Sequence, residues 1–253
     1  MNKKFLIGGG LVAVAVVAVA VWFLFLKDDA PDVVSNDAAN ADLDAVLGAD
    51  DETTDDQMTD DETTDDTPVG IDGVWVIDDE IGEFDFDTAS GSFAGFRVAE
   101  ELTIGEVTAV GRSGNVTGSV TIADGTLTGA EVTVDMTTIV SNDSRRENAI
   151  RGAINASEFP TAVFSFDGGV DVSSLEVGGA SQTFEIEGQL TVAGVTNAAT
   201  FTIDANVRDD GFSVITGSTD LVWEDFGVTP PSAPIVVSIA DEGTVEFQLI
   251  VAR

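Results

Sequence analysis

The sequence predicts an all-β protein built on an antiparallel sheet, and three observations support this fold class. From Val74 to Val251, apolar and polar residues alternate with a period of two, which is typical of half-buried strands. Dipeptides such as Asp124-Gly125 separate the alternating runs and favour tight hairpin turns. The last run, Val245 to Val251, is regular enough to close a sheet. Roughly eight such strands fit either an antiparallel sandwich or an up-and-down β-barrel.

Each expected strand places its apolar residues on one side. A barrel of about eight strands either fills with these side chains or encloses one small ligand. The alternating positions are, in order, Val116, Gly118, Val120 and Ile122; Val132, Val134 and Met136; Phe164 and Phe166; Phe184, Ile186, Leu190 and Val192; Phe201, Ile203, Ala205 and Val207; Phe212 and Val214; and Val245, Phe247, Leu249 and Val251.

One segment has helical spacing instead. Ser144-Arg-Arg-Glu147 reads as a capping box, and Pro160 stops the helix that follows it. The apolar residues between them recur at three and four positions, and Arg146 falls on their side of the helix. We therefore expect a single short helix that packs across one end of the barrel.

The composition divides the chain into an N-terminal anchor (1–27), an acidic linker (28–68) and the β domain (69–253). Residues 5–26 are uncharged and almost wholly apolar, and as a helix at ~1.5 Å per residue they cover roughly the 30 Å bilayer core. Lys3 and Lys4 precede this segment and only Lys27 follows it, which favours a cytoplasmic N-terminus and an extracytoplasmic domain. A cleaved signal peptide is the alternative, although its apolar region is usually shorter.

The linker is rich in Asp, Thr and Ala, and it repeats the block DETTDD at 51–56 and 61–66. Like charges repel one another and the apolar content is low, so the segment is expected to be disordered and extended. These acidic blocks lack the glycine and the ligand spacing of an EF-hand, so no metal site is expected there.

Composition also limits the function. The net charge of −36 and only seven arginines make nucleic acid an unsuitable partner. Between Val74 and Val251 there is no His, Cys, Tyr or Lys, so the usual acid, base and nucleophilic side chains are missing. Acidic doublets such as Glu100-Glu101 point to opposite faces of a strand and do not converge on one substrate. We expect a binding protein with no cofactor, not an enzyme.

Several motifs in order resemble the YceI-like family of lipocalin-like, polyisoprenoid-binding proteins. They are Val74 to Asp78 (VWVID), Ser144 to Phe166 (SRRENAIRGAINASEFPTAVFSF), Ile186 to Thr200 (IEGQLTVAGVTNAAT) and Glu224 to Val228 (EDFGV). The histidines that the family often carries after its opening strand are absent, so no role of theirs can be carried over. The resemblance implies a lipocalin-like barrel with an apolar tunnel for a prenyl chain of the quinone or polyprenyl phosphate type.

If the barrel holds such a lipid, inward aromatic and branched residues should line its lumen. Arg146, and with it Arg97, would contact the headgroup, because arginine offers a planar fork of donors. The alternative for either arginine is an ion pair with Glu83, Asp85 or Glu100, and the alternative function is a surface module for protein partners with a filled barrel. The candidate lining residues are Trp75, Phe84, Phe86, Val134, Met136, Phe164, Phe166, Ile186 and Trp223.

Overall fold

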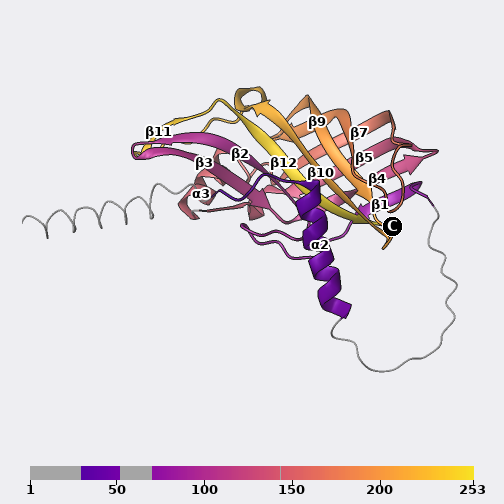
Figure 1. Cartoon of the computed structure of the whole chain (residues 1–253). Helices are drawn as coiled ribbons and strands as arrows, with labels where there is room; N and C mark the ends of the chain where they lie inside the picture. Colours follow the sequence, from indigo (N-terminus) through magenta and orange to yellow (C-terminus); the bar gives the residue numbers. More distant parts are fainter. Residues whose placement is uncertain (1–29, 52–69, 143) are drawn as a thin grey trace, which may run out of the picture.

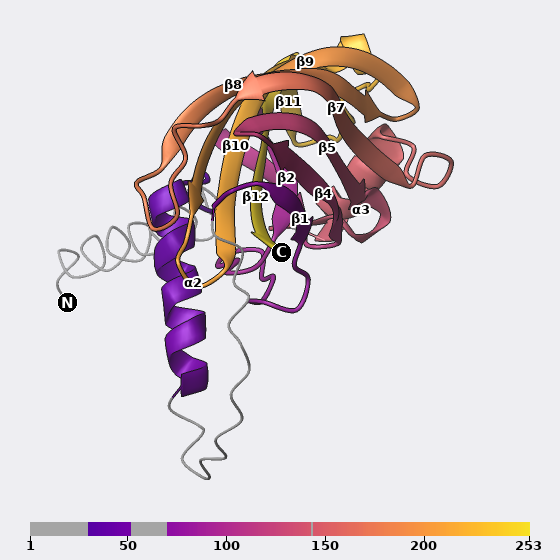
Figure 2. The ribbon, with the colours of Figure 1, turned by 90° about the vertical axis from the view of Figure 1, so that its right-hand side faces the viewer.

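The computed structural model describes residues 30–51, 70–142 and 144–253 of the chain. These residues form antiparallel strands that curve into a barrel, with two helices against it (Figures 1 and 2). The elements are α2 (Asn36–Asp51), β1 (Gly73–Ile77), β2 (Phe93–Leu102), β3 (Gly105–Ser113), β4 (Val116–Ala123), β5 (Thr126–Asp135), η1 (Met136–Thr138), β6 (Val140–Ser141), α3 (Ser144–Ala153), β7 (Thr161–Asp171), β8 (Gln182–Val192), β9 (Val195–Val207), β10 (Phe212–Val222), η2 (Trp223–Phe226), β11 (Val236–Ile239) and β12 (Glu242–Ala252).

Eight strands close the barrel in the order β1-β4-β5-β7-β8-β9-β10-β12, and β12 returns to β1. The closure uses the C-terminal strand, as its regular alternation predicts, with Ile77 opposite Val251. Of the two architectures that the sequence allowed, the structure has the barrel.

The strand order departs from the up-and-down order that we predicted. From β4 to β10 neighbouring ring strands follow the chain, but β1 pairs with β4 and β12 instead of β2. The five residues of β1 cannot cover the eleven residues of β12. The rest of that edge, Thr244 to Gln248, pairs with β2, which carries β3, β6 and β11 beyond the ring.

The barrel wall has two thin seams. The closing seam between β1 and β12 holds two residue pairs, Val76 with Ala252 and Ile77 with Val251. Only three residue pairs, Val163 to Ser165 with Gln189 to Thr191, join β7 to β8. On its other edge β8 pairs with β9 along eleven residues, from Gln182 to Val192. Beyond these three pairs, the described segments of β7 and β8 are not paired with one another.

Helix α2 corrects two sequence predictions, because it lies within the segment that we expected to be disordered and it is a second helix. Ala39 and Leu43, one turn apart, are fully buried against Val214 and Ile250 on the outside of the barrel. The Asn36 side chain donates to the Val214 carbonyl at 3.0 Å. A narrow apolar stripe in an alanine-rich segment is thus enough to dock the helix, even though the average composition is polar and acidic.

Among the described residues, no helix has the length and apolar character needed to cross a bilayer. The expected anchor at residues 5–26 lies outside these residues, as does the linker between residues 52 and 68.

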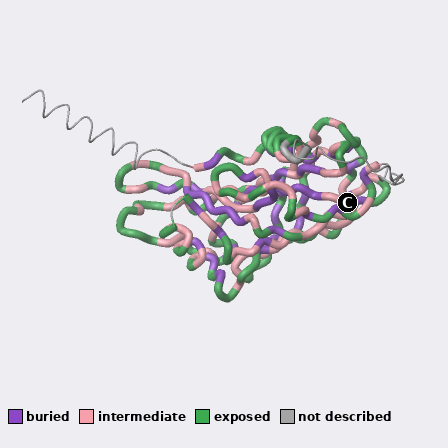
Figure 3. Tube along the Cα trace, turned by 90° about the horizontal axis from the view of Figure 1, so that it is seen from below, coloured by how far each residue is buried: buried purple, intermediate pink, exposed green. Residues whose placement is uncertain are grey.

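Burial follows the strands, and the exposed positions gather at turns and loops (Figure 3). The largest buried cluster lines the barrel interior and includes Trp75, Ile186 and Leu249, while a smaller one joins α2 to the outer face of β10 and β12. The barrel thus has apolar residues on both sides of part of its wall.

Leu43→Ala should loosen α2 while the barrel stays folded. Because Leu43 is fully buried, removing its side chain is expected to lower the free energy of opening of α2 by about 2 to 4 kcal/mol. Hydrogen exchange at the backbone amides of α2 measures this. Val33→Ala, at a site that is 61% exposed, is the control and should change little. Equal protection of α2 in both variants would show that the helix is not held by this contact.

Candidate functional site

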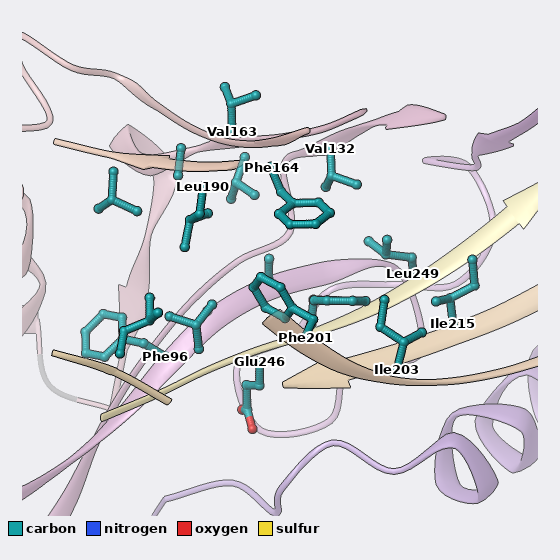
Figure 4. Close-up of a pocket in the computed structure, with 18 of the residues that line it drawn as sticks. Phe96, Val132, Val163, Phe164, Leu190, Phe201, Ile203, Ile215, Glu246 and Leu249 are labelled. Atoms are coloured by element: carbon teal, nitrogen blue, oxygen red, sulfur yellow. The ribbon is translucent and has the colours of Figure 1, made fainter. Parts of the chain in front are cut away.

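The barrel encloses a cavity of about 270 Å³. Its volume is close to the lower end of the range for small-molecule pockets, about 300 to 1,000 Å³. Figure 4 shows side chains such as Val132, Phe164 and Ile203 directed into this space from facing strands. The lumen is therefore not filled, which removes the filled barrel that the protein-interaction alternative assumed.

The wall of the cavity is almost entirely apolar. Alternate residues of each ring strand point inward, for example Val245, Phe247, Leu249 and Val251 on β12. Such a surface binds through burial of hydrocarbon. The polar residues at the cavity are Glu100, Arg146, Ser213 and Glu246.

Three phenylalanine rings meet inside the barrel. The ring of Phe201 lies 5.1 Å from that of Phe164 and 5.5 Å from that of Phe247, measured between centroids. Edge-on and tilted contacts at these separations are favourable aromatic arrangements. They give the middle of the lumen a rigid lining.

Glycines explain how large rings leave the lumen open. Gly217 pairs with Phe247 across β10 and β12, and a Cβ added there would lie 2.5 Å from the Phe247 ring. Gly111 pairs with Phe96 across β3 and β2, with a corresponding separation of 2.7 Å. Each ring therefore lies over a bare stretch of backbone, against the wall, where a side chain would otherwise push it inward.

Helix α3 covers one end of the cavity, as its predicted position across a barrel end implies. Ile150, Ala153 and Ile154 line the space. Ile150 and Ile154 also pack with Ile139 beneath the helix. The helix begins at Ser144, the first residue of the predicted capping box.

Arg146 reaches the cavity from α3, where it forms an ion pair with Glu100. Its guanidinium lies 2.7 Å from the Glu100 carboxylate and also donates to the Asn142 side chain. Glu100 is buried, with 6% of its surface exposed, and it lines the cavity as well. The ion pair that we weighed as an alternative role for Arg146 is therefore present, and it leaves this end of the cavity nearly neutral.

Arg97 does not line the cavity, which corrects its assignment to the headgroup. Its side chain points to the outer face of β2, where Nε donates to Glu246 at 2.8 Å. Glu246 is fully buried and also binds Arg112 at 2.8 Å, and in Figure 4 its carboxylate points away from the lumen side chains. Residues on one strand alternate between faces, so Phe96 takes the inward position and its neighbour takes the outward one.

Most of the predicted lining residues reach the lumen, and three do not. Phe84 and Phe86 belong to the connection between β1 and β2, where the Phe84 ring approaches Phe93 at 6.3 Å on the outer side. Phe166 packs against the core without lining the cavity. The predicted residues that do line it are Trp75, Val134, Met136, Phe164, Ile186 and Trp223.

Sequence reasoning did not select Val132, Phe201 or Phe247, although all three line the cavity. They belong to the alternating runs that predicted strands, but alternation marks every inward position alike. The signal that would have singled out Phe247 is its pairing with Gly217 on the neighbouring strand. That pairing is known only once the strand register is known.

Residues 83–251 match a family model described as YceI-like domain. A search of curated proteins returned no match. A polyisoprenoid binding domain from Saccharophagus degradans, implicated in plant cell wall breakdown, has a similar structure: 13% identity, 71% of this chain and 97% of that chain covered, TM-score 0.53. BcnA from Burkholderia cenocepacia is 17% identical, with 62% of this chain and 95% of that chain covered and a TM-score of 0.47. The Campylobacter jejuni YceI protein is 14% identical, with 56% of this chain and 84% of that chain covered and a TM-score of 0.45.

Gly217→Ala should destabilise the barrel by overpacking. The added methyl group meets the Phe247 ring at 2.5 Å, so ring or backbone must shift at a cost of about 1 to 3 kcal/mol. Thermal denaturation measures the loss. Gly129→Ala is the matched control, because its added carbon would meet only the Phe166 carbonyl oxygen, at 3.7 Å. If both variants unfold at the same temperature, the position of the Phe247 ring does not depend on the glycine.

Proposed function

Because the chain belongs to the YceI-like family, we propose that it holds the hydrocarbon chain of an isoprenoid lipid in its barrel cavity. The single observation that carries the proposal is the open lumen, whose wall is apolar from Trp75 at one end to α3 at the other. Each Å² of apolar surface removed from water contributes about 25 cal/mol, so a prenyl chain can bind with few polar contacts. The similar domain from Saccharophagus degradans is described as polyisoprenoid binding, which supports the same ligand class.

The role is storage or transport and involves no catalysis. The β domain lacks the His, Cys, Tyr and Lys side chains that commonly act as nucleophiles, acids or bases. The acidic residues at the cavity, Glu100 and Glu246, are both engaged with arginines. A protein that only binds a lipid does not need an unpaired carboxylate at its cavity.

The proposed location is the outer side of a membrane, with the N-terminus in the cytoplasm. The 22 uncharged residues from Phe5 to Leu26 supply the anchor, and the lysines at positions 3 and 4 favour its orientation. A lipid carrier on a membrane anchor remains close to the source of its cargo.

The Arg146–Glu100 pair favours a ligand with a neutral polar end, of the quinone type, over a polyprenyl phosphate. A phosphate placed near Arg146 would also face the Glu100 carboxylate, 2.7 Å from the guanidinium. Like charges in a site shielded from water repel strongly. The net charge of −36 adds to this preference.

The proposal predicts a prenyl lipid in the purified protein. Full-length chain extracted with organic solvent should release it for mass spectrometry. Val132→Trp, which places a large ring in the lumen, should abolish recovery, because the cavity is then occupied. Val74→Trp is the control, since Val74 is 52% exposed on the outside of β1. Absence of any prenyl lipid from the wild-type chain, combined with no binding of added lipid, would refute the proposal.

Glu100→Gln should shift the headgroup preference toward phosphate. The variant retains a hydrogen-bond acceptor for Arg146 but removes the opposing charge. Affinity for a polyprenyl phosphate should rise roughly tenfold or more, since removing a like charge at about 4 Å removes about 1 to 4 kcal/mol of repulsion. Affinity for the matching polyprenol should stay unchanged. Fluorescence of Trp75 and Trp223, which line the cavity, reports both titrations. An equal change for both lipids would exclude a headgroup position beside Arg146.

A further inference from the structure

One end of the barrel carries exposed apolar side chains on two adjoining segments, Leu102–Ile104 between β2 and β3 and Ile235–Val237 at the start of β11. We call these segments the apolar tip. Ile104 is 41% exposed, Ile235 49% and Val237 57%. The segments adjoin because the Thr103 amide donates to the Ile235 carbonyl at 2.8 Å and Val236 pairs with Leu102. In Figure 1 the tip lies at the end where β11, β2 and β3 project beyond the ring.

The apolar tip is also uncharged in a strongly acidic protein. The chain contains 46 Asp and Glu residues, yet residues 226–240 and 102–105 contain no charged side chain. Two exposed glutamates, Glu101 and Glu106, flank residues 102–105 and pair with each other across β2 and β3, and the Glu101 carboxylate accepts a hydrogen bond from Ser238 at 3.2 Å. The two carboxylates lie on the ring side of the β2–β3 turn, so the outermost residues of the tip are uncharged, and an uncharged apolar surface suits contact with an apolar medium.

The N-terminal segment 30–35, which we call the strap, leads toward the tip. Arg97 donates to the carbonyls of Pro31 and Asp32 at 2.7 and 2.6 Å, and Arg112 donates to the Asp32 carbonyl at 2.9 Å. Asn36, at the other end of the strap, is held beside Val214. Going back from Asn36 to Pro31, the strap follows β12 from Ile250 toward Glu246 and so toward the tip. In Figure 1 the coloured trace begins at the end of the barrel where α3 and β11 are labelled.

Chain length then fixes how far the tip can be from the anchor. Four Cα steps from Leu26 to Ala30 reach at most about 14 Å. From Arg97, which holds the strap, β2 continues five residues to Leu102, or about 17 Å toward the tip. Because the strap also runs toward the tip, an anchor that ended at Leu26 would hold the barrel close to the bilayer with the apolar tip on the membrane side.

From these two observations we infer that the apolar tip docks on the surface of a lipid bilayer, with Ile104, Ile235 and Val237 among the lipids. The inference rests on the anchor in the proposed function and deepens it, since the docked end is also the end where α3 covers the cavity. The strap, not a long tether, sets the distance. Because the protein is acidic, a bilayer with no net charge is the favoured surface.

Site-specific labelling of the full-length chain tests the inference, and the absence of native cysteine makes it simple. Ile235→Cys carries an environment-sensitive fluorophore, and the chain is reconstituted in phosphatidylcholine vesicles that contain nitroxide-labelled lipid. We expect a blue shift and a loss of fluorescence by quenching. Val177→Cys is the matched control: it is 45% exposed and lies beside Val207 at the opposite end of the barrel, so its label should not be quenched.

The outcomes separate the inference from the function on which it rests. Retention of the chain on vesicles after an alkaline carbonate wash reports the anchor, and mass spectrometry of bound lipid reports the cavity. A retained chain whose label at 235 is quenched no more than that at 177 would overturn docking alone. A blue shift that depends on protein density and not on nitroxide lipid would assign the tip to a second copy and also overturn it. Loss of the chain in the wash would overturn anchor and docking together.

Discussion

The pairing of glycines with aromatic rings across adjacent strands is the constraint on which the hollow barrel depends. Phe247 lies over Gly217 and Phe96 over Gly111, so bulky rings occupy space at the wall that a side chain would otherwise take. The same rings then form the rigid lining through their mutual contacts, as Phe201 does with Phe164 and Phe247. Large apolar residues and empty volume therefore coexist in a barrel of only eight ring strands.

The position of the strap depends on a buried charge cluster on the outer side of the barrel wall. Arg97 and Arg112 share the carboxylate of Glu246, which has no exposed surface. Two cations and one anion are costly to bury unless further acceptors complete the hydrogen bonding. The strap carbonyls at residues 31 and 32 are such acceptors. The cluster thus explains why polar residues of β12 face away from the lumen and why the N-terminal segment lies where it does.

The sequence predicted what local pattern determines. Alternation gave the strands, the capping box gave α3, and six of the nine proposed lining residues reach the cavity: Trp75, Val134, Met136, Phe164, Ile186 and Trp223. Properties that depend on strand register could not be predicted from the sequence. Arg97 and Arg146 look equivalent in the sequence, yet strand parity sends one outward and the helix sends the other inward. Helix α2 was missed because three buried positions, Asn36, Ala39 and Leu43, do not change the average composition of an acidic segment.

The thin seams between β7 and β8 and between β1 and β12 make the resistance of the barrel to widening unequal around its circumference. A change in girth between β8 and β9 would break eleven residue pairs, whereas only three pairs join β7 to β8 and only two join β1 to β12. Beyond their three pairs the spacing of β7 and β8 is governed by side chains, among them Phe166 and Phe184, that can change rotamer without loss of backbone hydrogen bonds. A guest thicker than the resting lumen would therefore meet less backbone resistance at these two seams than at the long ladders.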